Sequence, residues 1–313
     1  MPDAIVSVRG LVKRFGDFTA VDGVSFEVAR GEVFGLLGPN GAGKTTTISV
    51  LSCLLEPDGG EAFVAGHDVR TQSLEVRRAL GVVPQEIALY PTLTAVENLR
   101  FWGRMYGLSG AELDTAVAEG LELAGLEDKA RSKVETFSGG MKRRINIAAG
   151  TLHRPQVLIM DEPTVGIDPQ SRNHILDTVR ELNASGVTVI YTSHYMEEVE
   201  ALCDRIAIVD HGRVIAMGTL EELRALVGDE DRLRITTDAD SPVPLDAVRA
   251  VDGVSDAEQT GAELEVLAPD AAAVLGGVVE ALSASGVHVR AIEVAEPNLE
   301  SVFLHLTGRG LRD

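Results

Sequence analysis

The chain has 313 residues and a formal net charge of −20, from 28 basic and 48 acidic side chains. Its length predicts about two domains, and 45% apolar residues are enough for a sizeable core. A dedicated nucleic-acid binder normally needs a basic face, so the acidic balance predicts no DNA or RNA partner. Two cysteines, Cys53 and Cys203, are too few for a disulfide scaffold and are expected as reduced thiols.

The distribution of apolar residues along the sequence does not predict a membrane segment. The first residues contain no basic stretch followed by an apolar one, so no signal peptide is expected. A bilayer span requires roughly 18 or more consecutive apolar residues, and the chain contains no such run. Any membrane role is therefore expected to pass through a partner chain.

The first part of the chain has the pattern of an α/β domain. Its apolar runs predict buried strands at 33–37, 157–160 and 187–191, and a hairpin-like pair at 205–209 and 213–217. Between about 86 and 150 the pattern is mostly helical. This segment is therefore predicted to be a helical subdomain inserted into the sheet domain.

The C-terminal part has its own order of elements. Residues 229–313 hold 17 acidic and 6 basic side chains, a net of −11. The short polar segment 227–231 predicts a boundary, which gives domains 1–228 and 229–313. Beyond it the periodicities predict the order βαββαβ and a terminal helix, which favours a small α+β domain with a ferredoxin-like fold.

A phosphate-binding pattern follows the first predicted strand. Residues 38–45 read Gly-Pro-Asn-Gly-Ala-Gly-Lys-Thr, a match to the Walker A motif in its required place between a strand and a helix. Glycines let backbone N–H groups turn around phosphate oxygens, and the helix N-terminus adds partial positive charge. Lys44 is expected at the β/γ-phosphates and the Thr45 hydroxyl at Mg²⁺. The candidate nucleotide-binding residues here are Gly38, Pro39, Asn40, Gly41, Ala42, Gly43, Lys44, Thr45 and Thr46.

Two further segments supply candidate chemistry. Asp161 and Glu162 end the apolar run 157–160, so they are expected at the carboxyl end of a strand, where ligands bind in such sheets. Asp161 is a candidate Mg²⁺ ligand and Glu162 a candidate general base for the attacking water. Upstream, Ser138 precedes two glycines and is a good N-cap, which predicts a second helix N-terminus able to bind an anion.

These motifs in this order resemble the nucleotide-binding subunit of an ABC transporter, and the resemblance covers the whole chain. It implies that Ser138, Gly139 and Gly140 grip the γ-phosphate bound to an opposite subunit. Gln85 then matches the Q-loop glutamine, which senses Mg²⁺ and water and faces the membrane partner. The remaining matches are the D-loop aspartate Asp168, the switch histidine His194 at the γ-phosphate and the adenine-stacking aromatic Phe15, with Phe18 as its alternative.

The chain departs from the common family pattern at two places. Met141 stands where glutamine is common in the signature, which removes a side-chain amide but keeps the serine and both glycines. Residues 165–167 read Val-Gly-Ile where Ser-Ala-Leu is common, which leaves the hydrogen bonding of the D-loop open.

The branch of the family follows from the signature and the tail. The Ser-Gly-Gly-Met signature, one nucleotide-binding domain per chain and the tail segment 296–303 resemble drug-resistance exporters of bacteria and archaea, such as daunorubicin-resistance ATPases. This implies a subunit that hydrolyses ATP with Mg²⁺ and drives a separate integral-membrane permease for drugs or other hydrophobic cargo. It also implies a second copy of the chain across the ATP site, and a location at the cytoplasmic face of the cell membrane, held by the permease.

Two alternative functions share part of the motif set. A soluble ABC ATPase acting on ribosomes or DNA is one, but ribosome-acting relatives carry two ATPase domains and basic segments, and DNA-acting relatives carry long coiled coils. A P-loop kinase or GTPase is the other, and it would share Walker A without the Ser138–Gly140 signature and His194. Both alternatives are weaker than the exporter interpretation.

Overall fold

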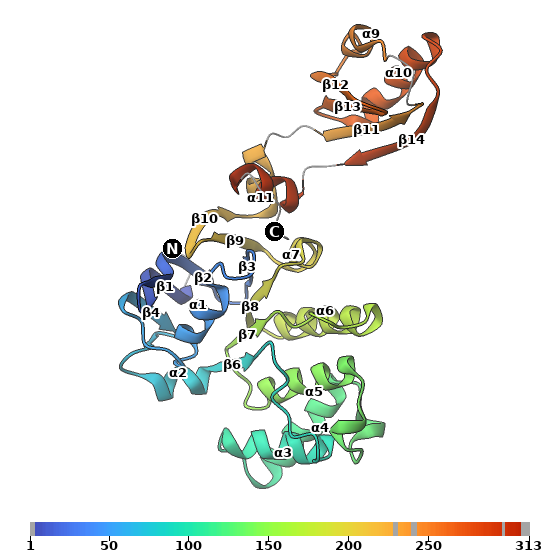
Figure 1. Ribbon diagram of the computed structural model, residues 1–313. Helices are drawn as coiled ribbons and strands as arrows, with labels where there is room; N and C mark the ends of the chain where they lie inside the picture. Colours follow the sequence, from blue (N-terminus) through green and yellow to red (C-terminus); the bar gives the residue numbers. More distant parts are fainter. Residues whose placement is uncertain (1–3, 228–230, 239–242, 296–297, 308–313) are drawn as a thin grey trace. The chain divides into compact units, whose positions relative to one another are not determined.

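The computed structural model describes residues 4–227, 231–238, 243–295 and 298–307 (Figure 1). The chain divides into two compact units between Leu220 and Glu221. Residues 228–230 of the expected boundary lie outside the described residues, so the boundary at 228/229 stays a prediction. Glu296 and Pro297 of the tail segment also lie outside them.

The first unit is built on a six-stranded sheet in the order β10-β9-β3-β8-β7-β6. The strands are β3 (Val33–Leu37), β6 (Leu80–Val83), β7 (Val157–Asp161), β8 (Thr188–Ser193), β9 (Arg205–Asp210) and β10 (Arg213–Gly218). All neighbours pair in parallel except β10, which pairs with β9 in antiparallel fashion. Every residue of β3, β7 and β8 is buried, which explains why these strands read as continuous apolar runs.

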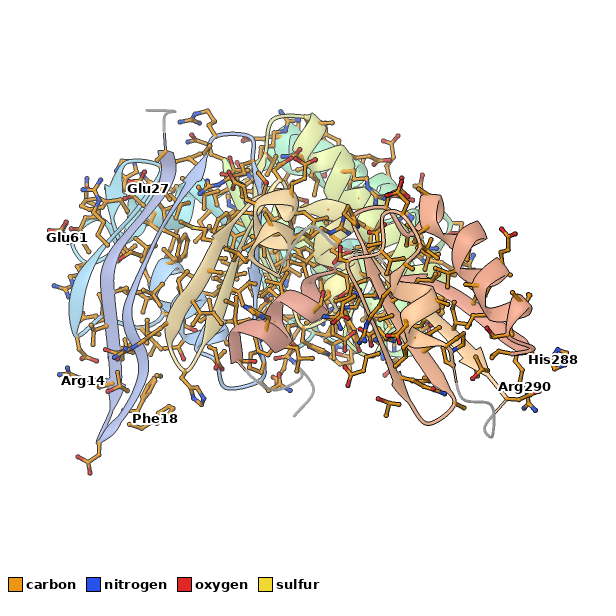
Figure 2. All side chains as sticks on the ribbon, turned by 90° about the horizontal axis from the view of Figure 1, so that it is seen from above. Arg14, Phe18, Glu27, Glu61, His288 and Arg290 are labelled. Atoms are coloured by element: carbon orange, nitrogen blue, oxygen red, sulfur yellow. The ribbon has the colours of Figure 1, made fainter. Side chains whose placement is uncertain are left out.

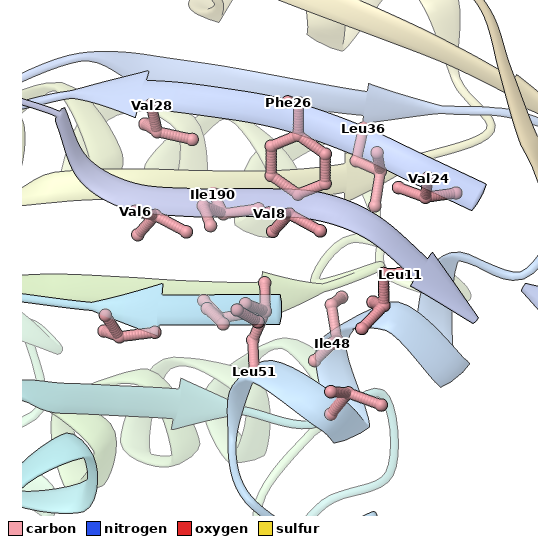
Figure 3. Packing of buried hydrophobic residues seen from close by; sticks show 14 of the residues in the cluster. Val6, Val8, Leu11, Val24, Phe26, Val28, Leu36, Ile48, Leu51 and Ile190 are labelled. Atoms are coloured by element: carbon pink, nitrogen blue, oxygen red, sulfur yellow. The ribbon is translucent and has the colours of Figure 1, made fainter. Parts of the chain in front are cut away.

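A second sheet, which the sequence analysis did not predict, belongs to the same unit. Its antiparallel strands are β1 (Ala4–Phe15), β2 (Phe18–Ala29), β4 (Gly59–Val64) and β5 (His67–Asp68), in the order β2-β1-β4-β5. Figure 3 shows its inward side chains, such as Val8 and Phe26, packing with Leu36 of β3 and Ile190 of β8. This shared core places the β1–β2 hairpin beside the turn that follows β3.

Helices cover the six-stranded sheet and form a subdomain at its β6 side (Figure 1). They are α1 (Lys44–Leu51), α2 (Ser73–Ala79), α3 (Ala95–Met105), α4 (Gly110–Leu123), α5 (Gly139–Thr151), α6 (Pro169–Ala184) and α7 (Met196–Leu202). Helices α3, α4 and α5 pack together around a core of their own that includes Leu99, Val117 and Ile145. They lie within the segment 86–150 that the sequence predicted to be helical.

Helix α8 (Leu220–Arg224) contains the division between the units, and the second unit continues from Glu221 as an α+β fold. Its elements are β11 (Asp231–Thr237), α9 (Leu245–Arg249), β12 (Asp256–Thr260), β13 (Glu263–Ala268), α10 (Ala271–Ala284), β14 (Val289–Ala295) and α11 (Leu299–Thr307). The antiparallel sheet has the order β12-β13-β11-β14, and α9 and α10 pack on it. The predicted βαββαβ order and the ferredoxin-like arrangement are therefore present.

The exposed surface includes the end of the β1–β2 hairpin, where Phe18 and Arg14 lie (Figure 2). Among the helices of the described residues, none combines the length and the apolar character needed to cross a bilayer.

Candidate functional site

The Walker A loop joins β3 to α1 and needs glycine at specific positions. Gly41 and Gly43 have φ angles of 81° and 101°, in the left-handed region that favours glycine. A Cβ atom on Gly43 would lie 2.4 Å from the carbonyl oxygen of Ala20, and one on Gly38 would lie 2.2 Å from that of Val209. No described side chain caps α1 at Gly43, so the amides of its first turn are free to bind an anion.

Lys44 supplies a buried positive charge at this loop. Its Nζ donates to the carbonyl oxygens of Gly38 at 2.6 Å and Pro39 at 3.1 Å, and it lies 3.3 Å from Glu162 Oε1. Burial lowers the pKa of Lys44, while the carboxylates of Glu162 and Asp161 act in the opposite direction. The ammonium group is thus held where phosphate oxygens would meet the loop amides.

The loop forms one wall of a cavity of about 350 Å³. Its lining residues are Phe15, Phe18, Ala20, Pro39, Asn40, Gly41, Gly43, Lys44, Thr45, Thr46, Gln85 and Glu162. The structure therefore brings together residues predicted from four separate motifs: the stacking aromatic, Walker A, the Q-loop glutamine and the acidic residue after β7. Gly38 and Ala42, also predicted, are buried within the loop and do not line the cavity.

Two aromatic side chains close the other side of the cavity. Phe15 and Phe18 face each other across the β1–β2 turn, so the hairpin presents both rings to the same space. Phe15 is 49% exposed and Phe18 is 63% exposed. Exposed rings at a cavity rim can stack on a planar ligand such as a nucleotide base.

Glu162 is the centre of the polar groups at the inner end of the cavity. Gln85 Nε2 donates to its Oε2 at 3.3 Å, His194 Nδ1 lies 3.4 Å from the same oxygen, and Lys44 approaches Oε1. Glu162 has a φ angle of 44°, an uncommon value for a residue with a side chain. Its amide is held by the carbonyl and hydroxyl oxygens of Thr192, at 3.2 and 3.0 Å.

Asp161 lies behind Glu162 at the end of β7. It is only 4% exposed, and Thr192 Oγ1 donates to its Oδ1 at 2.7 Å. Thr192 thus orients both acidic residues, a role that the sequence analysis missed. The one available signal was its position at the end of a predicted strand, directly before Ser193 and His194.

The signature residues form a second, separate cluster that does not line the cavity. Ser138 Oγ accepts from Met141 N at 3.2 Å and so caps α5, as expected. Asp168 caps α6 by accepting from Ser171 N at 2.9 Å, and this bond lowers the pKa of the Asp168 carboxyl. Ser138 and Gly139 are exposed, whereas Gly140 is buried against α6.

A side chain of α5 holds the loop that carries Gln85. Arg143 is 3% exposed and donates to the carbonyl oxygen of Pro84 at 2.7 Å and to that of Gln85. Asn146 Oδ1 accepts from Ala88 N at 3.0 Å in the same loop. Neither contact could be predicted from the sequence, since nothing in a basic helix indicates which carbonyl oxygens its arginines meet.

Comparisons with known proteins agree with this geometry. A family model described as "ABC transporter" matches residues 21–165, and one described as "ATP-binding protein DrrA1-3-like, C-terminal domain" matches residues 218–307. The linearmycin resistance ATP-binding protein LnrL of Bacillus subtilis (strain 168) is 51% identical, over 99% of this chain and 100% of its own length. The chain belongs to the ATP-binding subunits of ABC transporters.

Other relatives of this ABC ATPase support the same assignment. The daunorubicin/doxorubicin resistance ATP-binding protein DrrA of Streptomyces peucetius is 41% identical, over 100% of this chain and 95% of its own length. The ATP-binding cassette MJ0796, solved as a dimer with ADP and Pi, has a TM-score of 0.63 and 27% identity, covering 68% of this chain and 98% of its own.

These comparisons confirm three predictions: the ABC ATPase fold, ATP as the nucleotide and ATP hydrolysis as the activity. The alternative of a soluble ABC ATPase acting on ribosomes or DNA is not supported, because the two curated relatives described above are named as resistance ATP-binding proteins.

The residues at the site are compatible with Mg²⁺ beside the nucleotide phosphates. Within the described ranges, no group of three or more His, Cys, Asp or Glu side chains could hold a metal ion. Mg²⁺ in nucleotide sites usually takes one or two protein ligands and completes its shell with phosphate oxygens and water. The Thr45 hydroxyl and Gln85 lie on the cavity, with Asp161 behind them, and oxygen donors of this kind suit Mg²⁺.

Proposed function

We propose that this ABC ATPase drives the efflux of a drug or another hydrophobic compound through a separate integral-membrane permease. The observation that carries the cargo class is the 51% identity to a linearmycin resistance ATP-binding protein over nearly the whole chain. The match of residues 218–307 to a DrrA1-3-like C-terminal domain supports the same branch. The chain then lies at the cytoplasmic face of the membrane, held there by the permease, with no nucleic-acid partner.

Within the ATP site, each residue has a role that fits its position. Lys44 and the amides of the Walker A loop bind the phosphates, and Phe15 stacks on the base. Glu162 orients the attacking water and accepts its proton, since its carboxylate faces the cavity between Gln85 and His194. His194 and Gln85 then position the γ-phosphate and the water, respectively.

Mg²⁺ would be held by Thr45, Gln85 and Asp161, and when bound it would neutralise charge on the nucleotide phosphates. The side chains of Asp161 and Glu162 have separate roles. Asp161 is fixed by Thr192 and is 4% exposed, whereas Glu162 reaches the cavity itself. The two adjacent acids therefore divide metal binding and proton transfer between them.

The complete ATP site requires a second copy of the chain. The signature cluster of Ser138, Gly139 and Asp168 does not line the cavity of its own chain, yet Ser138 and Gly139 are exposed at a helix N-terminus that suits an anion. Two antiparallel copies would each cover the other's cavity with this cluster. Binding of ATP then closes the dimer and hydrolysis opens it again. The permease changes conformation with the closed and open states of the dimer.

Substitutions at Lys44 and Glu162 test the ATP site. Lys44→Ala should abolish ATP binding and hydrolysis, since it removes the charge at the β/γ-phosphates. Glu162→Gln should keep ATP binding and lower kcat by at least about 100-fold, the low end of a general-base contribution. Near-normal hydrolysis by Glu162→Gln would contradict the general-base assignment.

The second copy is tested by size-exclusion chromatography with ATP. A Glu162→Gln variant should form an ATP-dependent dimer, and Ser138→Arg in that background should lose the dimer while each monomer still binds ATP. A dimer that persists with Ser138→Arg would place the signature away from the interface. Purification of the chain from native membranes in mild detergent should bring the permease with it, and recovery of ribosomes or DNA instead would refute the efflux proposal.

A further inference from the structure

A buried carboxylate outside the ATP site gathers four hydrogen bonds. Glu198 of α7 is 1% exposed. Its Oε2 accepts from Thr164 Oγ1 at 2.8 Å, from the Tyr191 hydroxyl at 2.8 Å and from Ser193 Oγ at 3.3 Å. Its Oε1 accepts from Arg172 Nε at 2.5 Å. A buried carboxylate is stable only when it is paired and fully hydrogen-bonded, and here both conditions are met.

The donors come from the segments that carry the proposed catalytic residues. Thr164 follows Glu162 by two positions and Ser193 directly precedes His194. Arg172 lies in the first turns of α6, the helix that Asp168 caps. One carboxylate thus joins the end of β7, the end of β8 and the start of α6.

A second contact leads from Arg172 to His194. The Arg172 guanidinium lies 5.0 Å from the centre of the Tyr195 ring, which suits a cation–π contact. The centres of the Tyr195 and His194 rings are 4.3 Å apart. Ser193 Oγ also accepts from Tyr195 N at 2.9 Å. Tyr195 therefore links Arg172, which is bound to Glu198, to the histidine that faces Glu162.

We propose that Glu198 is a positioning residue for ATP hydrolysis, which fixes Glu162, Asp168 and His194 relative to one another through Thr164, Arg172 and Ser193. This inference rests on the proposed roles of Glu162 and His194. Glu198 does not line the cavity of the ATP site, and neither do the four residues that donate hydrogen bonds to it. Its effect is therefore on the rate of the chemical step and not on the binding of ATP.

The chemistry of a Glu198→Gln change makes the inference testable. A carboxylate offers only acceptors, whereas an amide of the same shape replaces one acceptor oxygen by two N–H donors. At least one of the present donors would then face another donor, and the Arg172 charge would lose its partner. Small shifts of catalytic groups are costly, since a misplacement of about 1 Å can lower a rate about 100-fold.

Glu32 provides a matched control. It is also a buried glutamate, 7% exposed, paired with an arginine: Arg205 Nη1 lies 3.2 Å from its Oε1, and Ala29 N donates to its Oε2 at 2.6 Å. It does not line the cavity, and its partners carry none of the proposed catalytic residues. Glu32→Gln should therefore lower thermal stability as Glu198→Gln does, without changing kcat.

The experiment compares steady-state ATP hydrolysis by the full chain carrying each change. Glu198→Gln should lower kcat by about 10-fold or more and change KM for ATP less than about threefold, while Glu32→Gln leaves both within about twofold. In a His194→Ala background, Glu198→Gln should add much less than its separate factor, because residues in one network are not additive. Thr164→Val keeps the shape of the side chain and removes one donor to Glu198. It tests the same inference if Glu198→Gln does not fold, and it should lower kcat with KM unchanged.

Two outcomes would overturn the inference. One is equal kcat for the Glu198→Gln and Glu32→Gln chains, or for Thr164→Val and the unchanged chain. The other is full additivity with His194→Ala. Failure of the proposed function is recognised separately, because it would appear as normal hydrolysis by Glu162→Gln.

Discussion

A Cβ atom on Gly140 would lie only 2.0 Å from the Oγ atom of Ser171, and 2.4 Å from its Cβ. The second glycine of the signature is therefore the point at which α5 touches α6. Gly139 has no such contact, since the nearest atom to a Cβ there is Ile167 Cδ1 at 3.9 Å. The two adjacent glycines have different physical reasons to be glycine.

We expect Gly140→Ala to destabilise the first unit by about 1–3 kcal/mol, the usual cost of an added methyl group without space. Gly139→Ala should leave stability unchanged or slightly higher, because alanine favours helix over glycine. It should nevertheless weaken the ATP-dependent dimer, since its methyl group would stand where the partner's phosphate approaches. Thermal denaturation and size-exclusion chromatography measure the two effects, and equal loss of stability in both variants would contradict the distinction.

Arg143 supplies a second prediction, about the link between α5 and Gln85. Arg143→Met keeps an unbranched side chain in the buried site but removes the donors to the carbonyl oxygens of Pro84 and Gln85. Hydrogen bonds from a charged group contribute about 1.5–3 kcal/mol each, so the loop should lose its fixed position. We expect kcat for ATP hydrolysis to fall about 10-fold with little change in KM.

The adjacent arginine is the control for this prediction. Arg144 Nη1 donates to the carbonyl oxygen of Ala124 at 2.8 Å, within the helical subdomain and away from Gln85. Arg144→Met should lower stability and leave kcat within about twofold. Equal kcat values for the two methionine variants would show that Arg143 does not act through Gln85.

The parts of the ATP site that the sequence predicted best are those whose functional residues are adjacent in the chain. Walker A and the pair Asp161–Glu162 each lie at the end of a fully buried strand, so both motif and strand were visible together. The β1–β2 hairpin was not predicted, since register shifts interrupt the regular alternation of its residues. Contacts that join distant segments, such as Arg143 to Gln85, leave no periodic pattern in a single sequence.

The signature illustrates the same limit at the level of one residue. In the sequence alone nothing distinguishes Gly139 from Gly140, and the resemblance assigned both to the γ-phosphate. Only the packing of α5 on Ser171 separates them, and that packing depends on residues about 30 positions apart in the chain. Glu198 was overlooked for a similar reason, because its four donors are recognisable only after β7, β8, α6 and α7 have assembled.

The aromatic pair at the hairpin gives a third prediction. We expect Phe15→Ala to raise the Kd for ATP about 10-fold, within the range of one lost base stack, about 1–3 kcal/mol. Phe18→Ala should have a smaller effect, since the Phe18 ring is the more exposed of the two, at 63% against 49%. Inorganic tripolyphosphate has no base, so its binding should not change in either variant. A larger effect of Phe18→Ala would reverse the assignment.

A fourth prediction concerns His153, where the helical subdomain meets β6. Its Nε2 lies 3.1 Å from the carbonyl oxygen of Leu80, and its ring stacks on that of Tyr106 with centres 3.7 Å apart. Its buried Nδ1 has no hydrogen-bond partner within the described part of the chain. Burial lowers the pKa of His153 below the usual value of 6.5, and the bond to Leu80 opposes this only in part.

The sign of the pH effect follows from this lowered pKa. Between the folded-state pKa and 6.5, the unfolded chain binds a proton at His153 that the folded chain does not. The stability contributed by neutral His153 is therefore fully present above pH 6.5 and is lost as the pH falls below it. His153→Gln keeps a donor for the Leu80 carbonyl oxygen and cannot titrate. Thermal denaturation of both chains between pH 5.5 and 7.5 should show a smaller decrease in Tm on acidification for His153→Gln, and equal decreases would show that His153 is protonated in the folded protein as readily as in the unfolded chain.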